Sequence, residues 1–156
     1  MNQLNIALRF LKSTYLEKRL KGISDIKTMI EKIEAAQYQA RKKNLGGVGE
    51  YEIVGARGLK PPKFITQETL KDWILSQKVL EIVFGENTHL EIVKRSGCIL
   101  KFLAKLNALP EESIDLLWKC QQGKHAEMVR VVYSTIQDLV PCIEVSYVDN
   151  FYSRIN

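Results

Sequence analysis

Apolar residues recur every three or four positions along nearly the whole chain, and this spacing constrains the fold more than any other feature. The segment from Tyr15 to about Lys43 predicts a long helix, with Thr14 as its cap, Glu17 completing a capping box, and Gly22 permitting a kink. One continuous apolar stripe marks its buried face: Leu16, Leu20, Ile23, Ile26, Ile30 and Ile33. Amphipathic helices of this kind bury their stripes by packing on one another, so an all-α fold is expected.

A shorter helix precedes this segment, with Leu4, Ala7, Leu8 and Leu11 on one face. Four further helices are predicted, at residues 66–84, 89–106, 109–122 and 124–140. Thr66 and Thr88 are the expected N-caps of the first two, and Pro110 lies in the first turn of the third. Gly123 separates the last two, and Pro141 ends the last.

Residues 66–74 and 110–118 match in residue type at an offset of 44 positions, as in Glu68 with Glu112 and Leu70 with Ile114. A helical period in the low forties is the spacing of HEAT and armadillo repeats. In such arrays each repeat packs on its neighbours, and together they build one continuous core. The sequence therefore predicts an armadillo/HEAT-like helical repeat (α-solenoid) segment.

A stretch rich in glycine and proline interrupts the helical pattern between residues 44 and 64, which is long for a connection inside a compact domain. The last residues, Val148 to Ile155, begin another apolar stripe that the chain does not complete. We therefore expect residues 1–156 to be a single helical-repeat domain from a much larger protein. Its expected parts are a basic helical hairpin (1–43), a loop (44–65), two helix pairs (66–140) and the start of a next unit (141–156).

The formal net charge of +5 is concentrated at the start, where residues 1–44 carry ten Lys or Arg and four Asp or Glu. Mixed signs of this kind are typical of a solvated helix face. The excess also makes an acidic protein or peptide a reasonable partner, while a helical nucleic-acid-binding domain is the alternative. The glycine-rich loop and its flanks either bind such a peptide or stay disordered. Their candidate binding residues are Arg41, Lys42, Lys43, Arg57, Lys60 and Lys63.

Enzymatic chemistry has one candidate, the pair Cys120 and His125 on either side of Gly123. A thiol nucleophile needs a base within hydrogen-bond reach, a group that orients the base, and donors for an oxyanion. No such third partner accompanies the pair, so we interpret Cys120 as a small buried side chain and Gly123 as an interhelical corner.

Other ligand chemistries find little support in the sequence. No metal-binding spacing surrounds the two histidines, and the glycine-rich stretch lacks the Gly-Lys-Ser/Thr of a phosphate loop, so no metal or cofactor is expected. Helical spacing indicates that the larger aromatic residues pack in the core or between repeats instead of forming a ligand cage. These are Trp73, Phe102, Trp118 and Tyr133.

The cellular setting can also be predicted. No apolar run approaches the length of a membrane span, and the N-terminus does not resemble a signal peptide. Three cysteines at wide separations give no disulfide framework. We expect a reducing compartment, the cytoplasm and also the nucleus.

The segment ALPEESIDLLWKCQQGKHAEMVRVVYSTIQDLV resembles the helical region upstream of the catalytic domain in very large ubiquitin-specific proteases of the fat-facets type. The resemblance rests on an Ala-Leu opening, an acidic helix ending in Trp118, and the turn at Gly123, Lys124 and His125. STYLEKRLKGISDIKTMIEKI and ILKFLAKLNAL are similar to other segments of that region, whereas the resemblance does not extend to the loop 44–64.

This resemblance implies a non-catalytic scaffold or protein-interaction segment of a cysteine-type deubiquitinating enzyme (ubiquitin carboxyl-terminal hydrolase). The family places its catalytic cysteine in a Gly-Asn-Thr-Cys-Tyr-like box, and its histidine in a distant motif. Neither motif is present in this sequence, so the resemblance assigns no catalytic role to Cys98, Cys120 or Cys142.

Overall fold

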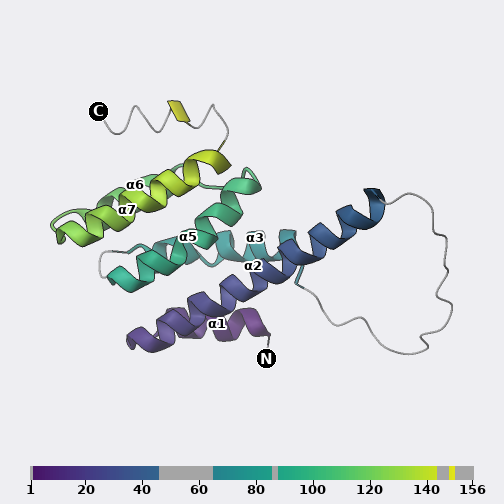
Figure 1. Cartoon of the computed structure of the whole chain (residues 1–156). Coiled ribbons are helices and arrows are strands. Elements are labelled where there is room, and N and C mark those ends of the chain that lie inside the picture. Colours follow the sequence, from purple (N-terminus) through teal and green to yellow (C-terminus); the bar gives the residue numbers. More distant parts are fainter. Residues whose placement is uncertain (1, 46–64, 86–87, 144–147, 150–156) are drawn as a thin grey trace.

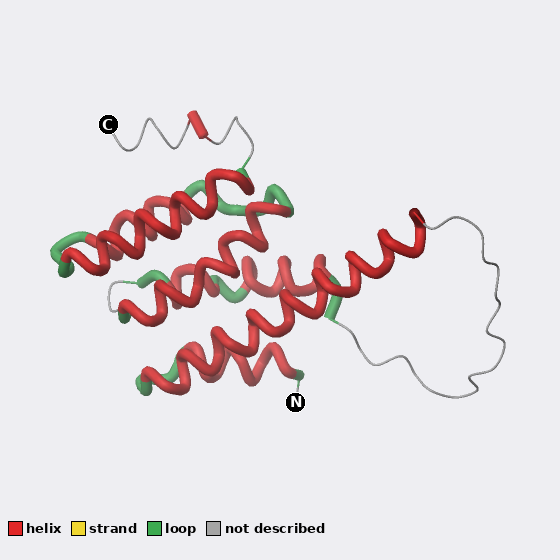
Figure 2. Tube along the Cα trace, viewed as in Figure 1, coloured by secondary structure: helices red, strands yellow, loops and turns green. Residues whose placement is uncertain are grey.

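The computed structural model describes residues 2–45, 65–85, 88–143 and 148–149 (Figure 1). These residues contain helices and turns but no β-strand, which confirms the predicted all-α class (Figure 2). The helical elements are α1 (Gln3–Leu11), α2 (Leu16–Leu45), α3 (Gln67–Ser76), α4 (Val79–Val83), α5 (Leu90–Lys105), α6 (Glu112–Gln121), α7 (Ala126–Leu139) and the 3-10 turn η1 (Val140–Cys142).

The helices stack in two layers. Helix α5 packs between α2 and α7, and these three helices form the nearer layer in Figure 1. In the second layer, α4 lies in the middle and contacts α1 on one side and α6 on the other. Each long helix is therefore backed by a shorter one that precedes it in the sequence, which is the arrangement of stacked helix pairs in an α-solenoid.

Helix α2 packs closely against α1 at Gly22. A Cβ atom at this position would lie 2.9 Å from the carbonyl oxygen of Ala7 and 3.0 Å from the amide nitrogen of Leu11. Only glycine lets the two backbones approach this closely, so Gly22 serves packing, and α2 continues through it as one helix. The helix begins at Leu16, one residue later than a Thr14 cap requires, and the Ser13 hydroxyl accepts a hydrogen bond from the Tyr15 amide at 3.2 Å.

The predicted helix 66–84 is wrong as a single element, because it divides into α3 and α4 at Lys78, whose φ is 51°. A continuous helix would carry the buried stripe of Leu70 and Ile74 on to Lys78 and Glu81. The break turns the chain so that apolar residues enter the core instead. These are Val79, Leu80 and Val83. Burying apolar side chains in place of charged ones outweighs the cost of one residue with positive φ.

The N-terminus of α5 also differs from the prediction. His89, not Thr88, is the N-cap, and its Nδ1 accepts a hydrogen bond from the Glu91 amide at 3.2 Å. Thr88 is buried, and its hydroxyl donates to the carbonyl of Val83 at 2.6 Å. Thr88 therefore satisfies the end of α4 instead of the start of α5.

The C-terminus of α5 is closed by Asn107, which has a φ of 51°. The Asn107 amide donates to Ala104 at 3.0 Å, and the Ala108 amide donates to Leu103 at 2.9 Å. This pair of bonds is a Schellman motif, and asparagine tolerates the left-handed conformation that the motif needs. The motif directs the chain toward α6, which begins two residues after Pro110.

Gly123 forms the corner between α6 and α7 with a φ of 68°. The predicted Thr66 cap of α3 is confirmed by a 3.1 Å hydrogen bond from the Thr69 amide to the Thr66 hydroxyl, and Pro141 lies in the 3-10 turn that follows α7. The two segments that match at an offset of 44 residues form the beginnings of α3 and α6. Most of the predicted next unit, 141–156, lies outside the described residues.

Two buried hydroxyl groups of the core, those of Ser96 and Thr135, are satisfied within their own helices. Ser96 donates to the carbonyl of Ile92 at 2.6 Å, and Thr135 donates to that of Val131 at 2.8 Å, in each case within one helix. Side-chain ion pairs between helices lie at the surface, as between Lys101 and Asp138 at 3.3 Å. The interior contacts between the helices are therefore mainly apolar, among residues such as Ile26, Ile99 and Val132.

Candidate functional site

Three of the six candidate binding residues fall in the part of the chain that the structure describes. Arg41, Lys42 and Lys43 are exposed near the C-terminus of α2, where lysines interact favourably with the helix dipole. Arg57, Lys60 and Lys63 lie outside the described residues. Helix α2 extends to Leu45, two residues beyond its predicted end, and so includes the beginning of the predicted loop.

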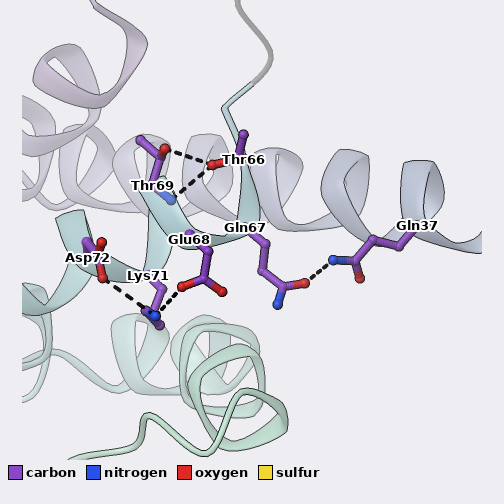
Figure 3. Close-up of polar contacts among 7 residues, drawn as sticks. All are labelled: Gln37, Thr66, Gln67, Glu68, Thr69, Lys71 and Asp72. Carbon is purple, nitrogen blue, oxygen red and sulfur yellow. Dashed lines mark hydrogen bonds and ion pairs between the residues drawn. The ribbon is translucent and has the colours of Figure 1, made fainter.

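Arg41 borders a hollow of about 580 Å³ between α2, the start of α3 and the end of α5. Its walls include Gln37, Tyr38, Phe102 and Lys105. The side-chain amide of Gln37 donates to that of Gln67, which links α2 to α3 (Figure 3). Across the hollow, Lys105 Nζ lies 2.7 Å from Glu34 Oε1 and links α2 to α5. These polar contacts position the end of α2 against the rest of the stack.

The start of α3 carries its own surface charges beside this hollow. Figure 3 shows Lys71 between Glu68 and Asp72, with Asp72 Oδ1 at 3.7 Å from the lysine nitrogen. The hydrogen bond with Glu68 raises the pKa of Lys71. Lys71 is therefore occupied by two carboxylates of its own helix, and the cations that line the hollow are Arg41 and Lys105.

A second depression, which we call the α2–α5–α7 groove, crosses the layer of long helices and has a volume of about 580 Å³. Its lining includes small residues from each of the three helices, Ser24, Gly97 and Ser134. Gly97 has no side chain, and an added Cβ would meet its nearest neighbour, the Thr135 side chain, only at 3.8 Å. The space that a larger residue would fill at this position is therefore open. The groove exists because each of the three helices presents small side chains at the level where they meet.

Charge in the α2–α5–α7 groove is predominantly positive. Its described lining contains four cations, Lys27, Lys94, Arg95 and Lys101, and a single carboxylate, Asp138. The four side chains extend from α2 and α5 and keep between 39% and 57% of their surface exposed. An acidic segment lying in the groove would meet several cations at once.

Each groove cation has an acidic neighbour. Lys27 lies 3.8 Å from Glu31, and Lys94 lies 3.2 Å from Glu127 and 3.4 Å from Glu91. The hydrogen bond with Glu127 and then that with Glu91 raise the pKa of Lys94. Glu31, Glu91 and Glu127 do not line the groove, so an acidic ligand can approach its cations from the open side.

Cys98 also lines the groove, half-buried, with its Sγ donating to the carbonyl of Arg95 at 3.4 Å. Burial raises the pKa of this thiol, and nearby Lys27 opposes that shift. A thiol that stays protonated is a poor nucleophile. We therefore interpret Cys98 as a residue that helps to form the wall of the groove, not as a reactive group.

Cys120 and His125 do not form a reactive pair. Cys120 is 2% exposed and donates its S–H to the carbonyl of Leu117 at 3.0 Å. Burial raises the pKa of this thiol to about 11, which removes the thiolate at neutral pH. His125 is exposed and occupies the N-cap position of α7. The interpretation of Cys120 as a small buried side chain beside a corner agrees with this geometry.

The aromatic residues behave largely as packing elements. Phe102 is buried, Trp73 and Trp118 pack against the core, and Tyr133 is 45% exposed. The rings of Trp118 and Tyr133 meet edge to face at 5.6 Å, which joins α6 to α7. Among the described residues, neither a group of three or more potential metal ligands nor a helix long and apolar enough to cross a membrane occurs.

The comparisons with known proteins agree with this architecture. The model of the UBP24/USP9X/USP9Y ARM repeat matches residues 1–156. The chain belongs to this ARM-repeat family. The predicted armadillo-like fold and the predicted resemblance to the fat-facets type of ubiquitin-specific protease are thereby confirmed.

Relatives of this ARM-repeat segment carry the names of ubiquitin carboxyl-terminal hydrolases. The puf hydrolase of Drosophila melanogaster is 29% identical over 140 residues, 90% of this chain and 3% of the relative. Ubiquitin carboxyl-terminal hydrolase 34 of Homo sapiens gives the same values. The probable hydrolase FAF of Drosophila melanogaster is 31% identical over 77 residues, 49% of this chain. The segment therefore spans a small part of the length of these relatives.

Sequence analysis missed the groove residues of the ARM-repeat segment. Lys27, Lys94, Arg95 and Lys101 are spread over 75 positions, and no local cluster of charge marks them. The available signal was periodic: Lys94, Cys98 and Lys101 follow the spacing of one helical face of α5. Assigning that face to the same side of the stack as Lys27 requires the order of the helices in space.

Proposed function

We propose that this ARM-repeat segment is a non-catalytic, protein-binding part of a large ubiquitin carboxyl-terminal hydrolase. The observation that carries the proposal is the open, positively lined α2–α5–α7 groove, which crosses three stacked helices in a chain of this family. The buried, protonated Cys120 supports a binding role over a catalytic one. Ubiquitin hydrolysis, which the names of the relatives indicate, is assigned to the rest of the parent chain.

A segment of this kind acts by holding a partner near the catalytic part of the same polypeptide. Tethering converts an encounter between two proteins into an intramolecular step with a high effective concentration. Stacked helices suit this role because each helix pair packs on its neighbours through apolar contacts and leaves an extended surface open to a ligand.

The partner is proposed to be an acidic protein or peptide. Residues 1–44 carry a charge balance of +6, ten basic against four acidic residues, and the groove lining has the same sign. A single-stranded nucleic acid is less well suited, because its bases stack on aromatic side chains and the groove's described lining contains none. The cytoplasm, and also the nucleus, is the proposed location, since Cys98, Cys120 and Cys142 are free thiols.

A binding assay with matched probes tests this proposal. The purified chain is titrated by fluorescence anisotropy with a labelled acidic peptide, its neutral Gln-substituted counterpart and a labelled single-stranded oligonucleotide. Preferential binding of the acidic peptide, weakening as salt rises, is the expected result. Tighter binding of the oligonucleotide would favour the nucleic-acid alternative, and equal affinity for both peptides would exclude an acidic partner.

A parallel assay tests the non-catalytic part of the proposal. The same protein is incubated with ubiquitin carrying a fluorogenic C-terminal amide, and we expect no release of the fluorophore. Release that stops after alkylation of the thiols would show that the segment is itself a cysteine hydrolase.

A further inference from the structure

We infer that an extended acidic segment of the partner binds in the α2–α5–α7 groove, where Lys101 is one of its anchors and Asp138 competes with the segment for that lysine. This inference rests on the proposed function and specifies its site and the residues that control it. It places binding away from the basic end of α2, where Arg41, Lys42 and Lys43 suggested it from the sequence.

The groove fits a short extended segment better than a helix. Packed helices lie about 8–10 Å apart, so a path across three of them covers roughly 20 Å. An extended chain advances about 3.3 Å per residue, and roughly six residues span this distance. The small residues Ser24, Gly97 and Ser134 leave room for a backbone to lie close to the helices.

The cations lie where such a segment would pass. Lys27 belongs to α2, whereas Lys94 and Arg95 share one turn of α5, the middle helix, and Lys101 lies about two turns further along it. Carboxylates at alternate positions of an extended chain are about 7 Å apart on one side, so the segment can reach cations on both helices. The α7 side of the groove contributes hydroxyl groups and Asp138.

Asp138 is the only described carboxylate that lines the groove, and it lies 3.3 Å from Lys101 Nζ. It therefore competes with an incoming carboxylate for the same lysine. The pair is surface-exposed, with side-chain exposures of 39% and 61%, so its exchange for a ligand carboxylate is easily reversible. Removing the charge of Asp138 frees Lys101 and also removes a repulsion from the acidic ligand.

This competition predicts opposite effects from two substitutions that face each other. Lys101→Ala should weaken binding of the labelled acidic peptide about 3-fold, whereas Asp138→Asn should strengthen it about 3-fold, within the range for exposed charge pairs. In the double variant, Asp138→Asn should give a smaller gain, because the lysine that it frees is absent. Circular dichroism establishes that each variant keeps its helical content.

Two controls remove or neutralise charge outside the groove. Lys42→Ala with Lys43→Ala removes positive charge from the end of α2, and Asp25→Asn neutralises an acid that lines a different hollow on α2. Both variants should bind the peptide within about 1.5-fold of the unmodified chain, since these charges lie away from the groove and are screened.

The outcomes separate this inference from the proposed function. If the acidic peptide binds but the α2-end variant weakens it more than Lys101→Ala does, the groove is the wrong site and the protein-binding role stands. Equal effects from all of these charge changes would show non-specific attraction and overturn the inference. If the acidic peptide does not bind the unmodified chain, the proposed acidic partner fails together with the groove.

Discussion

The first and last helix pairs, α1–α2 and α6–α7, both depend on a glycine, but for opposite reasons. Gly22 lies inside a helix with no space for a side chain, because the backbone of α1 is in contact with it. Gly123 has open space around it but a φ of 68°, which disfavours any residue with a Cβ. The first pair is thus joined by direct backbone packing, and the second by a sharp corner whose helices meet through side chains.

The largest expected effect is at Gly22. Gly22→Val would drive its side chain against backbone atoms of Ala7 and Leu11, which cannot move independently of α1. We expect the free energy of unfolding to fall by about 3 kcal/mol, measured by urea denaturation. Gly97→Ala is the matched control, because an added Cβ meets its nearest neighbour at 3.8 Å. It should leave stability unchanged or raise it by up to about 1 kcal/mol, and similar losses at both glycines would contradict the close-packing argument.

We expect the α6–α7 pair to make the free energy of unfolding depend on pH. The pKa of the Cys120 thiol is raised to about 11, above its ordinary value of 9.0, so the unfolded chain releases this proton first. Stability is full below the unfolded pKa and falls as pH rises from about 9 to 11, by roughly 2 to 3 kcal/mol.

Comparison of the unmodified chain with Cys120→Ala isolates this contribution. Urea denaturation at about pH 8 and pH 10.5 gives the loss of stability for each protein, and the loss should be smaller in the variant. Every other titratable group is present in both proteins, so the contributions of these groups cancel. An identical loss would mean that the buried thiol does not control the alkaline stability of α6.

A smaller effect is expected at the corner itself. Gly123→Ala should cost about 1 kcal/mol from conformational strain alone, since nothing lies within 4 Å of an added Cβ. Gly123→Asn should cost less, because asparagine tolerates positive φ. Thermal unfolding, monitored by circular dichroism, ranks the stabilities of the unmodified chain and the two variants. If asparagine and alanine cost the same, crowding and not backbone conformation would be the constraint at Gly123.

The smallest effect tests the side-chain contact of the second pair. Tyr133→Ala removes the edge-to-face contact with Trp118 and should cost about 0.5 to 1 kcal/mol, whereas Tyr133→Phe keeps the ring and should be nearly neutral. Tyr38→Ala on the exposed part of α2 is the control, and we expect a change within about 0.5 kcal/mol. An equal loss at both tyrosines would show that the contact with Trp118 adds nothing to stability.

The sequence predicted helices well where apolar stripes continue, and less well where the chain changes direction. The stripe of α2 gives its class and approximate length, whereas the role of Gly22 depends on α1, a separate element. The break at Lys78 has no glycine or proline to mark it. It occurs because a continuous helix would turn charged residues inward, and this conflict appears only when the position of the core is known.

The candidate site shows the same limit more strongly. Clustered charges such as Arg41, Lys42 and Lys43 are visible in the sequence, but Lys27 and Lys101 become neighbours only through the packing of α2 on α5. Caps were predictable from residue type at Thr66 and not at His89, because the buried Thr88 bonds to the preceding helix instead. Features formed by neighbouring residues can be predicted from the sequence, whereas a site shared by several helices requires their arrangement in space.

The hydrogen bonds of two buried hydroxyl groups affect how the helix stack can deform. Ser96 and Thr135 form their hydrogen bonds within their own helices, and apolar contacts fill the space between α5 and α7. Apolar surfaces are not directional, so neighbouring helices can slide by small amounts without breaking a buried hydrogen bond. The stack should therefore respond to a pulling or bending force as a soft spring, with many small shifts spread over its interfaces.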